Sequence, residues 1–122
     1  MALELRKEAK KDRIELIYYI VIHQTATTVA TVEAMLAAFN GKPKYTTDGA
    51  PYYTGTNYSV DRDGRIDEWA DPHKYWTNNS NGPFTNQSIG IDFVLTPGQI
   101  PTEIQYRAGA ALIETLQGLY DK

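Results

Sequence analysis

The residue best suited to chemistry is His23, which follows an almost unbroken apolar segment. Residues Leu16–Ile22 are typical of a strand buried on both faces of a sheet, and the chain becomes small and polar directly after His23. A strand that ends on an imidazole offers a metal ligand or a general base on a rigid element. The alternative is a hydrogen-bonded histidine with a purely structural role at the end of a strand.

A second candidate, Asp92, interrupts another apolar segment, Ser88–Leu95. An acid inside a central strand must find a partner, become neutral or face a cleft, because an unpaired buried charge is costly. A carboxylate near the end of one central strand and His23 at the end of another could converge on one pocket. Alternatively, Asp92 simply faces water at the end of its strand.

The segments between these residues predict an α/β pattern. Apolar residues recur on one helical face from Val32 to Phe39, with Thr27 or Thr28 as the helix cap. Two further strands, Thr56–Val60 and Arg65–Trp69, are predicted on either side of an Asp-Gly turn signal. A C-terminal helix is predicted over Pro101–Tyr120, so we expect a mixed central β-sheet flanked by helices.

The rest of the chain is assigned to an extension and to loops. Residues 1–14 are expected to form an N-terminal extension, with charged Leu3–Lys11 favouring helix, and residues 15–122 to form the α/β domain. Lys42–Gly55 is predicted as a polar loop that carries three tyrosines, and Asp71–Gln87 as a long loop that includes Phe84. Loops of that length in a compact domain are commonly functional.

Composition excludes several classes of function. A length of 122 residues suits one domain, and a net charge of −3 gives no basic field for nucleic acid. The absence of cysteine excludes disulfides, thiol nucleophiles and thiolate metal sites. No apolar segment approaches the roughly 20 residues of a membrane span, and the N-terminus has no apolar signal core. We therefore expect synthesis in the cytoplasm without a signal peptide; the oligomeric state is not predicted.

In this order the segments resemble the type 2 N-acetylmuramoyl-L-alanine amidases, which share their fold with the peptidoglycan-recognition proteins. The resemblance covers about Tyr18–Tyr120 and is carried by IVIHQTA, the DRDGRI hairpin, a tryptophan-containing loop and NQSIGID. It implies that His23 is a zinc ligand and that Asp92 is the catalytic general base or the partner of zinc-bound water. The expected reaction is hydrolysis of the lactyl-amide bond between muramic acid and L-alanine in peptidoglycan by zinc-activated water. The substrate-binding candidates are Tyr52, Tyr53, Asn57, Trp69, Trp76 and Asn86.

The metal site departs from the family pattern. The family places a second histidine and a cysteine or aspartate after the last helix, whereas this sequence stops at Lys122, where that helix ends. The other histidine, His73, stands in the loop DPHKYW and could supply an extra ligand in an unusual His-His-Asp site. His23 and Asp92 alone are fewer than the three protein ligands usual for catalytic zinc. The resemblance therefore implies zinc as the cofactor, whereas this sequence supplies an incomplete set of zinc ligands.

Three functions remain open from the sequence. The first is a zinc-dependent amidase, truncated or degenerate here, which could act on the cell wall as an endolysin-like phage lysin. The second is an inactive module of the same fold that binds muropeptides or another small ligand. The third is a phage-type interaction protein that reuses the fold. We place the enzyme before the binding module.

Overall fold

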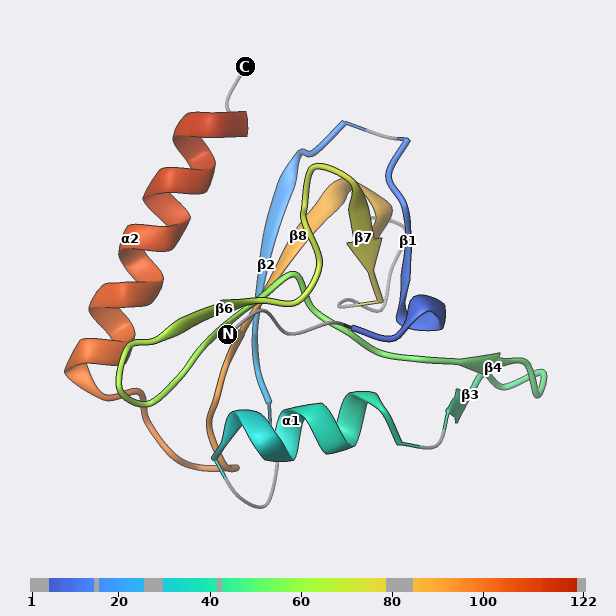
Figure 1. The fold of residues 1–122 in the computed structure, drawn as a ribbon, viewed down its shortest axis with the longest axis horizontal. Coiled ribbons are helices and arrows are strands. Elements are labelled where there is room, and N and C mark those ends of the chain that lie inside the picture. Colours follow the sequence, from blue (N-terminus) through green and yellow to red (C-terminus); the bar gives the residue numbers. More distant parts are fainter. Residues whose placement is uncertain (1–4, 15, 26–29, 42, 79–84, 121–122) are drawn as a thin grey trace.

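A mixed four-stranded sheet forms the centre of the computed structural model, which describes residues 5–14, 16–25, 30–41, 43–78 and 85–120. The strand order is β2-β8-β5-β6. Figure 1 shows β2 and β8 side by side. Strand β8 is parallel to both β2 and β5, and β6 runs antiparallel to β5. The bounds of these strands are Tyr19–Gln24 for β2, Tyr58–Val60 for β5, Ile66–Glu68 for β6 and Ser88–Phe93 for β8.

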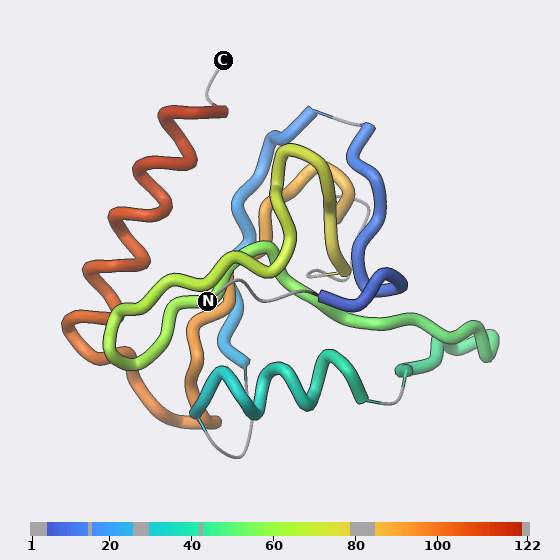
Figure 2. Tube along the Cα trace, in the orientation of Figure 1, coloured from blue at the N-terminus to red at the C-terminus, as the bar shows by residue number. Residues whose placement is uncertain are grey.

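Among the described residues, two helices and two small sheets lie around this centre. Figure 2 traces the path of the chain through them. Neither helix combines the length and apolar character needed to cross a bilayer. The elements are the 3-10 turns η1 (Lys7–Ala9) and η2 (Thr85–Gln87), the helices α1 (Val32–Phe39) and α2 (Glu103–Tyr120), the pair β1 (Lys10–Asp12) and β7 (Tyr75–Thr77), and the pair β3 (Lys44–Tyr45) and β4 (Pro51–Tyr52).

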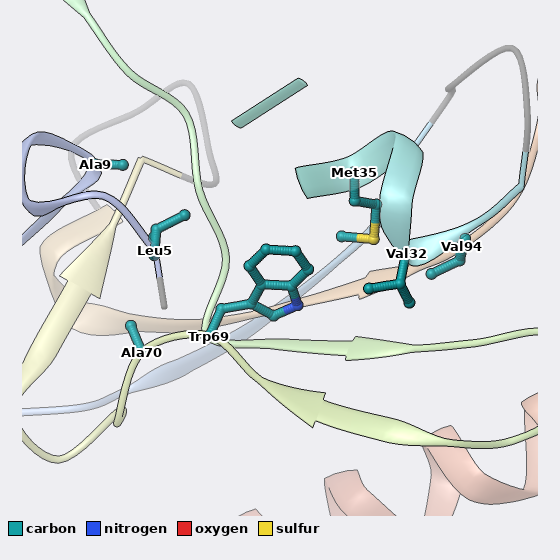
Figure 3. Packing of buried hydrophobic residues seen from close by; sticks show 7 residues of the cluster. All are labelled: Leu5, Ala9, Val32, Met35, Trp69, Ala70 and Val94. Atoms are coloured by element: carbon teal, nitrogen blue, oxygen red, sulfur yellow. The ribbon is translucent and has the colours of Figure 1, made fainter. Parts of the chain in front are cut away.

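Strand β8 separates two apolar clusters, because alternate side chains of a strand point to opposite faces. On one face, Val94 packs with Val32 and Met35 of α1 and with Trp69 (Figure 3). On the other face, Ile89, Ile91 and Phe93 pack with Leu116 of α2. The prediction of a mixed α/β sheet flanked by helices is therefore confirmed.

The prediction that Leu16–Ile22 is a strand buried on both faces is wrong. The strand begins at Tyr19 and ends at Gln24, and Leu16, Tyr18 and Ile22 are 61%, 64% and 53% exposed. The reason is the position of β2 at the edge of the described sheet, where it has one neighbouring strand. Its apolar side chains border an open groove against α2.

The described residues of the N-terminal segment do not form the helix that the propensity of Leu3–Lys11 favours. Within the described residues, the short turn η1 leads into strand β1, which pairs with β7. Burial of Leu5 and Ala9 against the core, together with strand pairing, overrides the local helix propensity. Helix α1 is confirmed but is capped by Thr31, whose side chain accepts a hydrogen bond from the Ala34 amide at 3.1 Å. The predicted caps Thr27 and Thr28, and Phe84, lie outside the described residues.

The contact between α2 and β8 generates a stability prediction. A Cβ atom at Gly109 would lie 2.2 Å from Phe93 Cζ, whereas a Cβ at Gly118 meets no described atom within 4 Å. We expect Gly109→Ala to lower the free energy of unfolding by about 1–3 kcal/mol. Gly118→Ala, the matched control in the same helix, should leave it unchanged or raise it by up to about 1 kcal/mol. Urea denaturation followed by circular dichroism measures both, and equal effects would contradict this packing.

Candidate functional site

The parallel register brings His23 and Asp92 side by side. They are direct partners in the pairing of β2 with β8. Side chains of paired residues project from the same face of a sheet, and adjacent strands are about 4.8 Å apart. Both residues line one groove, on the face of the sheet that carries α1. The structure therefore unites the two residues singled out in the sequence.

This groove has a volume of about 760 Å³ and mixes polar and aromatic side chains. Its base is the end of strands β2 and β8, and much of its wall is the β3–β4 hairpin. Besides His23 and Asp92, it is lined by Gln24, Thr25, Phe39, Lys44, Tyr45, Thr46, Thr47, Tyr52, Thr54, Gly55 and Asn78.

The two central residues differ in their environment. His23 is exposed, whereas Asp92 is only 9% exposed within the fully buried strand β8. Burial disfavours the charged form of a carboxyl group and raises the pKa of Asp92 to about 7. A carboxyl group with that pKa can accept or donate a proton near neutral pH, as general acid–base chemistry requires.

The buried side chains beneath the groove hold β8 in place. Asn57 donates to the carbonyl oxygens of Ala70 at 3.0 Å and Tyr75 at 3.1 Å, and its own side-chain oxygen accepts from the Gly90 amide at 3.0 Å. Trp69 Nε1 donates at 2.9 Å to the hydroxyl of Ser59. Ser59 is the register partner of Asp92 on β5. These contacts fix the strand two residues before Asp92 and the strand beside it.

Asn57 and Trp69, which the sequence suggested as substrate-binding residues, do not line the groove. Asn57 is 0% exposed and Trp69 is 2% exposed. The side-chain amide of Asn57 and the indole N–H of Trp69 form hydrogen bonds inside the protein, because a buried donor needs a partner.

Three further predicted substrate-binding residues, Tyr53, Trp76 and Asn86, lie outside the groove lining. The guanidinium of Arg6 lies over the ring of Tyr53, with Arg6 Cζ 3.8 Å from the ring centroid. Trp76 is on β7, where it pairs with Lys11 of β1. Asn86 belongs to η2, where its carbonyl oxygen accepts from Arg13. Of the predicted substrate-binding residues, Tyr52 lines the groove. Lys44, Tyr45 and Asn78 also line it and were not selected from the sequence. The concentration of tyrosines in Lys42–Gly55 was the one sequence signal for this wall, and it gave no indication of Asn78.

His73 is not brought to the other two residues. It lines a different groove, of about 1050 Å³, which lies between β2 and α2. That groove is mostly apolar and includes Ile14, Leu16 and Ile22.

The described residues do not complete a site for catalytic zinc. Among them, no group of three or more histidine, cysteine, aspartate or glutamate side chains is arranged to hold a metal ion. His23 and Asp92 together offer an imidazole and a carboxylate, whereas catalytic zinc ordinarily uses three protein ligands. The expected zinc site is therefore incomplete within the described part of the chain.

Comparison with known families decides the classification. The sequence model of the N-acetylmuramoyl-L-alanine amidases matches residues 13–122. The chain belongs to this amidase family. The resemblance seen in the sequence is thereby confirmed, and with it a relation to peptidoglycan. No curated protein sequence matches the chain.

Solved structures share the amidase fold. A selenomethionine derivative of AmpD superposes with a TM-score of 0.74 at 19% identity, covering 98% of this chain and 75% of AmpD. The Ph2119 endolysin, from a bacteriophage of Thermus scotoductus MAT2119, gives 0.67 at 20% identity, covering 98% of this chain and 80% of the endolysin. The peptidoglycan recognition proteins LCa and LCx, solved with tracheal cytotoxin, give 0.66 at 25% identity, covering 97% of this chain and 77% of theirs.

The raised pKa of Asp92 predicts how stability depends on pH. Between about pH 4 and pH 7 the unfolded state has lost this proton while the folded state retains it, so the free energy of unfolding falls as pH rises. We expect Asp92→Asn in metal-free protein to be more stable than wild type above pH 7, by an amount on the order of a few kcal/mol. The difference should shrink toward pH 4.

Denaturant unfolding between pH 4 and pH 8 measures this difference. Asp48→Asn is the control, because the pKa of that exposed carboxyl is lowered by its hydrogen bond with Thr46, which gives the opposite sign. Strong destabilisation by Asp92→Asn at every pH would contradict the account and identify Asp92 as a structural hydrogen-bond acceptor.

Proposed function

We propose that this protein recognises muropeptides, the sugar–peptide fragments of peptidoglycan, in the groove of His23 and Asp92. The observation that carries the proposal is the pairing of an exposed imidazole with a buried carboxyl group at the base of a polar and aromatic groove, within an amidase-family fold. Ligand sites typically combine apolar or aromatic walls with a few converging polar groups. Tyr45 and Tyr52 offer ring faces to a sugar, and Asn78 offers an amide to a peptide backbone.

The structural relatives support this class of ligand. Tracheal cytotoxin is bound to the recognition proteins LCa and LCx, and in a further relative, recognition protein LE, it is described as monomeric diaminopimelic acid-type peptidoglycan. A fold of this kind can thus hold a small peptidoglycan fragment.

Hydrolysis of the lactyl-amide bond by zinc-activated water is the second candidate. The specific observation that favours it is again the His23–Asp92 pair, which matches the residue types of the family's chemistry. The reaction needs more metal ligands than the described residues provide. Action on the cell wall as a phage-type lysin belongs to this candidate.

Binding and metal analysis separate the two candidates. We expect an N-acetylmuramyl tetrapeptide to bind, with calorimetric affinity unchanged by chelator and without stoichiometric zinc in the purified protein. His23→Ala should weaken binding about 10-fold, the effect of losing one good hydrogen bond. His73→Ala, the matched control in the other groove, should not weaken it.

Other outcomes would overturn the proposal in distinct ways. Stoichiometric zinc and chelator-sensitive release of the peptide, detected by mass spectrometry, would establish the amidase instead. The absence of both binding and cleavage would favour a protein that uses the fold for another interaction.

A further inference from the structure

The groove carries a positive charge on its wall as well as the Asp92 carboxyl group at its base. Lys44 is the one lysine or arginine among the described residues that line it. Because electrostatic complementarity in a binding site selects partners by charge, this ammonium group bears on which ligands the groove accepts.

The β3–β4 hairpin fixes where Lys44 sits. Lys44 is the antiparallel partner of Tyr52, so the two side chains project from the same face of the hairpin, and both line the groove. The turn is held by the Thr46 amide, which donates to the Ala50 carbonyl oxygen at 2.9 Å, and by Gly49 at φ 89°. A left-handed φ of this kind suits glycine. The lysine therefore stands on a closed turn rather than on an irregular loop.

No described carboxylate forms an ion pair with Lys44. The side chain of Lys44 is exposed, which leaves its ammonium group open to a ligand.

We infer that Lys44 is a specificity-determining residue that selects ligands with a free carboxylate, bound so that the carboxylate meets the hairpin while an amide group lies at His23 and Asp92. The inference rests on the proposed muropeptide function and narrows it to acidic stem peptides. An ammonium group on a flexible stem pairs with a carboxylate as a point charge and does not distinguish its exact orientation. Amidation of that carboxylate removes the attraction without changing the size of the ligand.

The test compares two forms of one ligand. Calorimetry is performed in chelator-treated, low-salt buffer with an N-acetylmuramyl tetrapeptide whose stem carboxylates are free and with the fully amidated form. We expect wild type to prefer the acidic form by about 5-fold, the upper range for a solvent-accessible ion pair. Lys44→Gln should remove the preference, and Lys44→Glu should reverse it. Lys7→Gln and Lys7→Glu, at an exposed lysine outside the groove lining, should keep the wild-type preference.

The contradicting results are distinguishable. If both forms bind equally and Lys44→Gln binds like wild type, the role of Lys44 is overturned while the muropeptide function stands. If neither form binds wild type, both proposals are overturned. A preference that Lys7→Gln removes as fully as Lys44→Gln would also overturn the assignment, because general surface charge would then explain it.

Discussion

The candidate site depends on the register between β2 and β8. A slip of one residue would turn either His23 or Asp92 to the opposite face of the sheet. Hydrogen bonds beyond the strand ends hold this register: Tyr18 donates to the Gln87 carbonyl oxygen at 2.8 Å at one end, and Thr25 donates to that of Phe93 at 3.0 Å at the other. The Thr25 hydroxyl also donates to the Leu95 carbonyl oxygen at 2.9 Å and accepts from the Leu95 amide at 3.1 Å. Thr25, two residues after His23, therefore helps to hold His23 in position.

The groove combines a firmly held base with a wall near the surface. The fully buried side chain of Gln105 donates to the carbonyl oxygens of Val60 at 2.9 Å and Val94 at 3.1 Å. These hydrogen bonds connect α2 to β5 and to the residue that follows β8. Arg13 donates to four backbone carbonyl oxygens, including that of Ser88 at 2.8 Å, at the start of β8. The β3–β4 hairpin has no comparable burial. A rigid base suits a fixed pair of chemical groups, and an exposed wall suits recognition of variable ligand parts.

Features that depend on the local sequence pattern were predicted correctly, whereas the burial and contacts that depend on distant segments of the chain were not. The apolar character of β8, the acidic residue Asp92 within it and the place of His23 near the end of β2 could be predicted, because residues close in sequence determine these features. Asn57 looked like a ligand-binding amide, yet its partners lie more than ten residues away at Ala70, Tyr75 and Gly90. The prediction that the first strand is buried on both faces was wrong for a similar reason. The position of β2 at the edge depends on the order of strands in the whole sheet. Lys44 belongs to no recognisable sequence motif. Its place in the groove wall became apparent from the position of the β3–β4 hairpin beside the ends of β2 and β8.

Disulfide crosslinking can establish whether His23 and Asp92 lie side by side on one face of the sheet. The chain contains no cysteine, so paired cysteines can be introduced without background. Adjacent strands are about 4.8 Å apart, and this spacing lies within the Cα separation of roughly 4.4–6.8 Å that disulfides require. We expect the double variant His23→Cys/Asp92→Cys to form an intramolecular disulfide under mild oxidation, detected by intact mass. The variant Ile22→Cys/Asp92→Cys, whose side chains lie on opposite faces of the sheet, should not form one. Failure of the first pair to crosslink, or equal crosslinking of both pairs, would mean that His23 and Asp92 do not share a face.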